Sequence, residues 1–324
     1  MLNSEQYEIT PSYLKWNPSN GLSSPYTLTN KKCRAIMSAM HEACPELIRH
    51  SVRRIPGFPA LPFEPLDVSA STGLLKALST TDSGNKRRIL GKSEKVSKGL
   101  NQGVLTAVVY LAPASMSGVN LCPWSSAGCR SACLRNHGRM SMGLQTRAQL
   151  YKAWWFLLYP IHFLTRLKKE IEALERKAKK NGLIPAVRLN GTSDIPWEKT
   201  GIFDLFEDVR FYDYTKAPLN KRQDASNYHL TFSVSDKRGS LAMGQRYVDN
   251  GRNASIVVGD TERTADGGKS TALRIVKSGA LFSRPAIDGD KTDVRFQDKP
   301  GSFVVLSAKG PIARRDETGF VKRF

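Results

Sequence analysis

Three of the five cysteines lie within twelve residues, in the segment CPWSSAGCRSAC at 122–133. Their spacing is C-x6-C-x3-C, and His137 follows four residues after the last cysteine. Thiolates bind soft and borderline metals. Three cysteines suit a [4Fe–4S] cluster with one iron left open, whereas three cysteines and His137 would form a closed zinc site. We therefore expect Cys122, Cys129 and Cys133 to bind a metal, with His137 as the optional fourth ligand.

Two aspartates form the second candidate group. Asp194 and Asp213 each follow a short apolar segment, at 185–189 and 209–212. One carboxylate could attack the anomeric carbon of a nucleotide while the other moves the proton, which is the pairing that base exchange needs. A helix cap is the alternative role for Asp194. The same segment ends supply five candidate substrate-binding residues: Arg188, Asn190, Ser193, Tyr214 and Lys216.

The elements around these residues indicate an α/β fold. Six short apolar segments that end in polar residues are predicted strands, and helical patterns at 144–159 and 161–180 follow the first of them. The predicted strands are 105–111, 185–189, 209–212, 228–232, 254–258 and 303–306. Buried strands separated by helices favour a parallel sheet. Polar residues at successive strand ends favour a (β/α) barrel or partial barrel of about six parallel strands; an open doubly wound sheet is the alternative.

The chain divides into two predicted regions. Residues 1–100 form an N-terminal helical and irregular extension with a proline-rich connector at 55–65, and residues 101–324 form the barrel-like catalytic domain. A basic loop within 79–100 is predicted to bind nucleic-acid phosphates, although a merely solvated loop would have the same composition. Its cations are Lys86, Arg87, Arg88, Lys92, Lys95 and Lys98.

The overall charge points to a polyanionic partner. The chain has 49 Lys and Arg against 29 Asp and Glu, which gives a net charge of +20 and an isoelectric point near 9.9. Such a field attracts nucleic acid, and we expect DNA as the partner. No apolar run is long enough to span a membrane and no secretion signal is evident, so we expect a reducing cytoplasm, free cysteines and no membrane association.

Six longer strings stand out between about residues 100 and 320. They are NLCPWSSAGCRSACL, RLNGTSDIPWE, FYDYTK, NYHLTFSVS, IDGDKTDVRF and VLSAKG. Together they resemble the phage gene product 88 family. The resemblance implies a bacteriophage protein that acts in the cytoplasm of the infected bacterial host.

Two further groups are similar in layout. Radical S-adenosylmethionine enzymes are partial (β/α) barrels with three cysteines after the first strand. Their usual spacing is C-x3-C-x2-C and a Gly-Gly-Glu run follows their second strand, where this chain has NGTSD. The barrel transglycosylases that insert 7-deazaguanine bases into RNA or DNA use strand-end aspartates and a structural zinc. This chain lacks their C-x-C-x2-C…H pattern.

Three functions follow as hypotheses. The first is a phage enzyme that exchanges DNA bases through Asp194 and Asp213 on a barrel with a cysteine-bound metal. The second is an iron–sulfur enzyme similar to the radical S-adenosylmethionine group, with S-adenosylmethionine as a further cofactor. The third is a non-catalytic DNA-binding protein with a structural zinc. The sequence does not fix the oligomeric state.

Overall fold

The computed structural model describes residues 76, 79–80, 83–92, 94–117, 120–158, 160–264 and 266–324. Most of the predicted N-terminal extension, including the proline-rich connector, therefore lies outside the described residues. Within the basic loop at 79–100, only residues 81, 82 and 93 lie outside the described residues.

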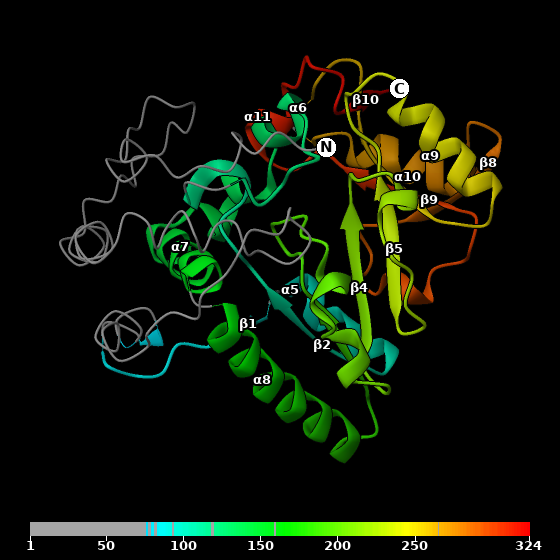
Figure 1. The fold of residues 1–324 in the computed structure, drawn as a ribbon. Coiled ribbons are helices and arrows are strands. Elements are labelled where there is room, and N and C mark those ends of the chain that lie inside the picture. Colours follow the sequence, from blue (N-terminus) through cyan, green and yellow to red (C-terminus); the bar gives the residue numbers. More distant parts are fainter. Residues whose placement is uncertain are drawn as a thin grey trace.

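A single mostly parallel sheet organises the described part of the chain (Figure 1). Its order is β1-β2-β3-β4-β5-β6-β9-β8-β7, and β10 pairs with β6. Neighbours from β2 to β8 along this path are parallel, whereas β1 and β7 pair antiparallel at the edges. The strands are β1 (Leu90–Gly91), β2 (Val104–Val109), β3 (Ile184–Arg188), β4 (Arg210–Thr215), β5 (Tyr228–Ser233), β6 (Ala254–Gly259), β7 (Ala280–Leu281), β8 (Arg284–Asp288), β9 (Phe303–Ser307) and β10 (Lys322–Arg323).

The predicted α/β class is confirmed, but the sheet is not a closed barrel. Each of the six predicted strands overlaps a strand of the sheet, and these strands are parallel to one another as expected. The pairing path of the described strands begins at β1 and ends at β7, so of the two predicted forms, barrel and partial barrel, the closed barrel is absent. The short strand β8 was not predicted, because Pro285 and charged residues interrupt its apolar pattern.

Long helices cover one face of the sheet. The helices are α5 (Glu94–Ser97), α6 (Ala127–Ser131), α7 (Gly143–Leu158), α8 (Pro160–Lys180), α9 (Ser240–Asp249), α10 (Lys269–Ser278) and α11 (Gly310–Arg314). In α8, Phe163, Leu167 and Ile171 recur every four residues and are fully buried, whereas the opposite side is charged. This apolar stripe belongs to the same core as Val109 and Val187 of the sheet. None of the described helices is long and apolar enough to span a membrane.

The connection from β8 to β9 covers the other face, here called the inner face. Val294 packs with Val104 of β2, Ala186 of β3 and Tyr212 of β4, although β8 lies at the far end of the sheet. Asp293 accepts a 2.8 Å hydrogen bond from Arg188 on β3. The inner face thus buries polar side chains, in contrast to the apolar face beneath the helices.

The carboxyl ends of β5 and β6 separate. The two strands share only the pairs Phe232–Ala254 and Ser233–Ser255. Farther along β6, Val258 and Gly259 pair instead with the last strand, β10. The segment 316–324 therefore lies at the carboxyl edge of the sheet, where the predicted site residues also end.

Candidate functional site at the carboxyl edge

The cysteine loop connects β2 to α7 and contains the short helix α6. Ser126 caps α6, because its hydroxyl accepts a 3.1 Å hydrogen bond from the Cys129 amide. The same hydroxyl donates to the carboxylate of Asp236, which also accepts a 3.3 Å bond from the Gly128 amide. Asp236 follows β5, so the start of the cysteine helix is tied to the carboxyl end of a strand three places along the sheet.

Gly128 lets this helix approach the C-terminal segment closely. A Cβ at Gly128 would lie 2.0 Å from Thr318 Oγ1 and 2.7 Å from the Cβ of Phe320. Cys129 packs on the same apolar cluster as Phe320. The cysteine loop thus packs against the last residues of the chain.

Gly128→Ala is therefore expected to displace the cysteine loop and to lower the free energy of unfolding by about 1–3 kcal/mol. Denaturant unfolding measures this, and Thr318→Ala should restore part of the loss by removing the nearest clash. Gly91→Ala is the control, because a Cβ there meets its nearest atom at an ordinary 3.6 Å. Equal free energies of unfolding for the two glycine variants would contradict the close packing of the cysteine loop against the C-terminal segment.

The three thiols of the loop influence one another electrostatically. Burial raises the pKa of each, that of Cys133 to about 11, and ionisation of neighbouring cysteines raises the values for Cys122 and Cys133 further. Backbone hydrogen bonds act in the opposite direction; the Ala114 amide donates to Cys122 Sγ over 3.2 Å. Cys122 Sγ also lies 3.6 Å from the carbonyl of Thr192, just after β3. Cys122 therefore lies next to the carboxyl end of β3.

The structure does not discriminate between the cluster and the zinc alternatives. The described residues contain no group of three or more His, Cys, Asp or Glu gathered tightly enough to hold one ion. The role of the three cysteines as metal ligands stays a prediction.

His137 faces a different neighbour. Its ring packs on Gly310 at the start of α11, where a Cβ would lie 2.1 Å from Nδ1. Burial lowers its pKa, a hydrogen bond to the Ala132 backbone raises it, and Arg314 lowers it again. The structure therefore gives His137 a packing role against α11, and its role as a fourth metal ligand stays a prediction.

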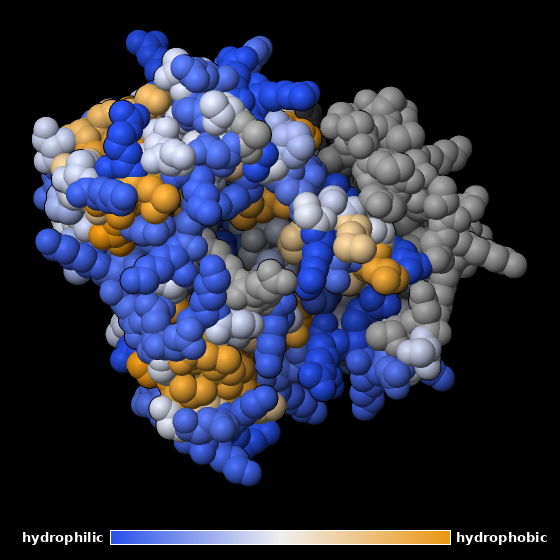
Figure 2. Space-filling model, turned by 180° about the vertical axis from the view of Figure 1, so that it is seen from behind, coloured by the Kyte–Doolittle hydropathy of each residue, from blue (hydrophilic) through white to orange (hydrophobic). Residues whose placement is uncertain are grey.

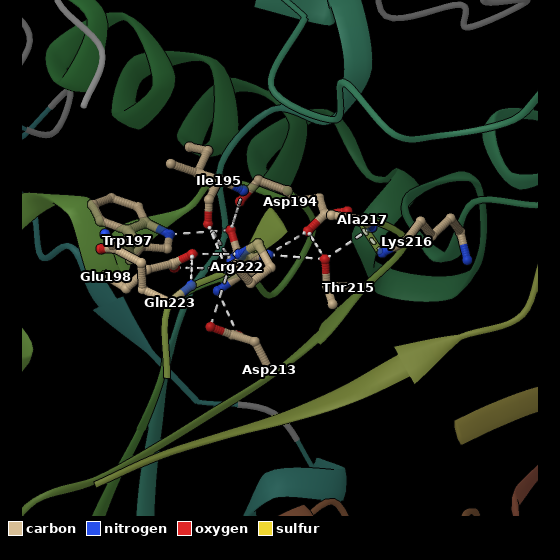
Figure 3. A network of polar contacts seen from close by, with 12 residues as sticks. Asp194, Ile195, Trp197, Glu198, Asp213, Thr215, Lys216, Ala217, Arg222 and Gln223 are labelled. Atoms are coloured by element: carbon tan, nitrogen blue, oxygen red, sulfur yellow. Dashed lines mark hydrogen bonds and ion pairs between the residues drawn. The ribbon is translucent and has the colours of Figure 1, made fainter. Parts of the chain in front are cut away.

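Asp194 lies in a buried polar network around Arg222 (Figure 3). Its Oδ1 accepts bonds from Thr215 Oγ1 at 2.8 Å and Arg222 Nη1 at 3.1 Å. Its Oδ2 accepts the backbone amide of Lys216 at 2.9 Å. Asp194 does not cap a helix, because the next helical turn begins after Pro196. Both carboxylate oxygens are instead used to join the end of β3 to the end of β4.

Asp213 belongs to the same network but is fully buried. It accepts a 2.7 Å bond from the Asn190 amide and a 3.2 Å bond from the Tyr228 hydroxyl. Burial raises its pKa to about 7, against the lowering influence of Arg188, the Asn190 amide and Arg222. The two predicted catalytic aspartates are thus brought into one network, linked through Arg222 and Tyr228.

Asn190 and Ser193 shape the loop after β3. Asn190 Oδ1 accepts bonds from Ser193 Oγ at 2.9 Å, from the Ile195 amide at 2.9 Å and from Trp197 Nε1 at 3.0 Å. Both residues are buried. The structure assigns both residues a role in the conformation of this loop, and their contact with substrate stays a prediction.

The other predicted substrate-binding residues lie on the inner face and remain partly exposed. The Arg188 guanidinium lies 4.9 Å from the centre of the Tyr214 ring and pairs with Asp293. Lys216 donates a 2.8 Å hydrogen bond to Ser233 Oγ and lies over the Phe320 ring, and its charge lowers the pKa of Cys129 and Cys133. Lys216 therefore connects the inner face with the cysteine loop. Figure 2, which views the molecule from behind, shows a mainly hydrophilic face with a central hollow.

The basic loop divides between the two edges of the sheet. Because β1 pairs antiparallel with β2, with Leu90 opposite Val109, the residues before β1 extend toward the carboxyl edge. Those after it lead into α5 and the start of β2 at the amino edge. Arg87 also donates to the Thr80 carbonyl and lies over the Tyr151 ring, which is a structural role. Of the six predicted phosphate-binding cations, Lys86, Arg87 and Arg88 precede β1, and Lys92, Lys95 and Lys98 follow it.

Sequence reasoning missed Glu198, Arg222 and Asp236. Asp236 follows β5 in the way that Asp194 and Asp213 follow or end their strands, so the same strand-end pattern could have identified it. Arg222 lies in a loop after β4, and no local signal in the sequence distinguishes it from the many surface arginines.

Together these observations define an α/β protein whose open parallel sheet has a cysteine loop and a buried ionic network at its carboxyl edge. The model of the family described as gene product 88 matches residues 77–323, and the chain therefore belongs to this phage protein family. No curated protein and no solved structure matches the chain.

Proposed function

We propose that this protein is an iron–sulfur enzyme that acts on nucleic acid, with its cluster bound by Cys122, Cys129 and Cys133. The observation that carries the proposal is the convergence of these thiols at the carboxyl edge, next to the ends of β3, β4 and β5. A cluster bound by three cysteines supplies electron transfer and one iron that is open to a further ligand. S-adenosylmethionine is the candidate for that ligand. The open sheet corresponds to a partial barrel in this proposal.

Backbone amides near the sulfurs support this choice. The Ala114 amide bonds Cys122 Sγ, and backbone hydrogen bonds from Ser126 and Arg135 lower the pKa of Cys129 and Cys133. Such bonds stabilise the ionised form of sulfur, which is the form that binds metal. Lys216 acts in the same direction from the end of β4.

Charge supports nucleic acid, and DNA in particular, as the substrate class. The net charge of +20 favours a polyanion. Exposed cations follow the strand ends around the cysteine loop, and these are Arg130, Lys237, Arg238 and Lys309. A base in a duplex would have to be flipped into the site, which costs a few kcal/mol that phosphate contacts must offset. The cytoplasm of the infected host is the compartment in which such a phage enzyme would meet DNA.

DNA base exchange is the second candidate. One observation favours it, because a carboxyl group with a pKa of about 7, as at Asp213, is suited to proton transfer near neutral pH. The nucleophile that this reaction needs has less support. Both oxygens of Asp194 already accept hydrogen bonds from Thr215, Arg222 and the Lys216 amide. A non-catalytic DNA-binding protein with a structural zinc is the third candidate.

The test is the metal content and absorption spectrum of the full chain purified without oxygen. We expect about four iron atoms per chain and a brown colour, both lost in Cys129→Ser and both retained in Cys44→Ser, a cysteine outside the cysteine loop. DNA added to the same preparation should bind, and binding should weaken steeply with salt. One zinc per chain without colour would overturn the iron–sulfur proposal in favour of the zinc readings.

A further inference from the structure

Trp124 differs from the other tryptophans that the structure describes. It lies in the cysteine loop, two residues after Cys122, and is partly exposed. The other three are at most 5% exposed, and each donates its indole N–H to a protein acceptor; they are Trp154, Trp155 and Trp197. Among the described residues, none accepts the indole N–H of Trp124. A large aromatic ring left partly in water is typical of a binding surface.

A turn fixes the position of Trp124. The Ser125 amide and hydroxyl both donate to the Cys122 carbonyl, over 3.0 and 2.8 Å, and so close the turn that contains Trp124. Lys237, which follows β5, donates a 2.9 Å hydrogen bond to the Trp124 carbonyl. The ring is therefore held at the carboxyl edge by two loops, one after β2 and one after β5. A ligand that binds there does not have to order it first.

Exposed cations flank this ring. Lys237 Nζ lies 6.0 Å from the centre of the Trp124 ring, and Arg130 Nη1 donates over 3.3 Å to the carbonyl of Ser125, the next residue. Neither cation forms an ion pair within the described part of the chain. The neighbouring carboxylate of Asp236 accepts its hydrogen bonds from the start of α6 instead. The surface around Trp124 thus combines an aromatic ring with two cations that are not neutralised by carboxylates.

We propose that Trp124 is a stacking platform for an unpaired base of single-stranded DNA, and that Lys237 and Arg130 bind the adjoining phosphates. Proteins that bind single strands combine these two elements, because the aromatic ring stacks on the face of a base while cations contact the backbone. An acidic protein segment would use the cations but has no need of the ring. The inference rests on the nucleic-acid part of the proposed function, which it makes more specific, and it requires no metal at the cysteines.

The ring and the cations should affect binding in different ways. Stacking needs a base, whereas each phosphate contact releases counterions and therefore adds to the salt dependence of binding. An abasic strand, which keeps the sugar–phosphate backbone without bases, reports on the cations alone. Comparing the two strands separates the contribution of Trp124 from that of Lys237 and Arg130.

The experiment measures the binding of the full chain to a labelled thymidine oligonucleotide of about 12 nucleotides by fluorescence anisotropy. Trp124→Leu should weaken binding by about 5–100-fold without changing its salt dependence, and Trp124→Phe, which keeps an aromatic ring, should recover most of the affinity. On an abasic strand of the same length, Trp124→Leu should bind as the wild type does.

The cation variants provide the contrasting result. Lys237→Met and Arg130→Met should each weaken binding to both strands and lower the slope of log affinity against log salt by about 0.7. The control is Leu205→Ala, a 57% exposed apolar residue before the start of β4, which should bind both strands as the wild type does. Thermal unfolding of every variant is measured in parallel.

Four results would overturn the inference. They are a wild type that does not bind the thymidine strand, a wild type that binds the abasic strand equally tightly, a Trp124→Leu variant with unchanged affinity, and a Trp124→Leu variant that loses affinity for both strands alike. The last result would mean that the substitution displaces the loop.

Failure of the iron–sulfur proposal is distinguishable from failure of the stacking role. A colourless protein with one zinc per chain that still binds the thymidine strand through Trp124 supports the stacking role while it overturns the iron–sulfur centre. A brown, iron-containing protein whose binding does not depend on bases overturns the stacking role alone.

Discussion

Arg222→Met should lower the free energy of unfolding by about 3–5 kcal/mol. The Arg222 side chain is 4% exposed and binds Glu198 through two hydrogen bonds of 2.6 and 2.9 Å. It also donates to Asp194 over 3.1 Å. Methionine fills a similar volume but leaves these two buried carboxylates without their cation, and an uncompensated buried charge is the expensive outcome. Denaturant unfolding of the variant and the wild type measures the difference.

Two comparisons make this prediction specific. Arg252→Met removes an ion pair of similar length, 2.7 Å to Asp224, but both side chains are 44% or more exposed. That change should cost less than about 1 kcal/mol. Adding Glu198→Gln to Arg222→Met should restore part of the lost stability, because one orphaned charge disappears. If the arginine variants are equally stable, the network does not hold the carboxyl edge together.

Arg222 also explains how the site is kept in shape. It joins the loop after β3, through Asp194 and Glu198, to the end of β4, through Thr215. The Lys216 amide is bound by the same Asp194 carboxylate, so the network determines where the Lys216 side chain begins its path toward the cysteine loop. We therefore expect Arg222→Met both to lower the free energy of unfolding and to displace Lys216 in the candidate site.

The sheet could be predicted from the sequence because its strands are strong local signals. The segments of β2, β3 and β9 are short, mainly apolar runs, and such runs can be recognised in the sequence alone. Their parallel arrangement follows from the helices between them. Closure into a barrel could not be predicted, since it depends on whether the edge strands β1 and β7 meet. Each of these has only two residues and carries almost no periodic signal.

The site was predictable in its members and less so in their roles. Asp194 and Asp213 follow or end neighbouring strands, and the structure joins them in one network through Arg222 and Tyr228. The strand-end pattern could not show that Asp194 would be enclosed by Arg222, which lies 28 residues later and reaches it only in the folded chain. The sequence likewise could not show that the His137 ring packs on Gly310, more than 170 residues away along the chain.

We expect the titration of Asp213 to contribute to the pH dependence of the free energy of unfolding. The folded protein keeps this carboxyl group protonated up to its pKa of about 7, whereas the unfolded chain releases the proton near pH 4. Between these values the folded state binds more protons, so this group makes the free energy of unfolding fall as the pH rises from 4 to 7. The contribution levels off above pH 7, and its full size is about 4 kcal/mol.

Asp213→Asn tests this, because the amide has nearly the same shape and does not ionise. Relative to the wild type, the variant should gain up to about 4 kcal/mol between pH 4 and pH 8, as measured by denaturant unfolding at several pH values. Asp249→Asn is a control of opposite sign. The exposed Asp249 carboxylate is bonded by Arg284, which lowers its pKa, so that variant should lose a little stability over the acidic part of the range. Parallel curves for Asp213→Asn and the wild type would mean that the buried carboxyl group is ionised throughout. Its charge would then be balanced by Arg188 and Arg222, and the proton-transfer role that base exchange requires of Asp213 would lose its one supporting observation.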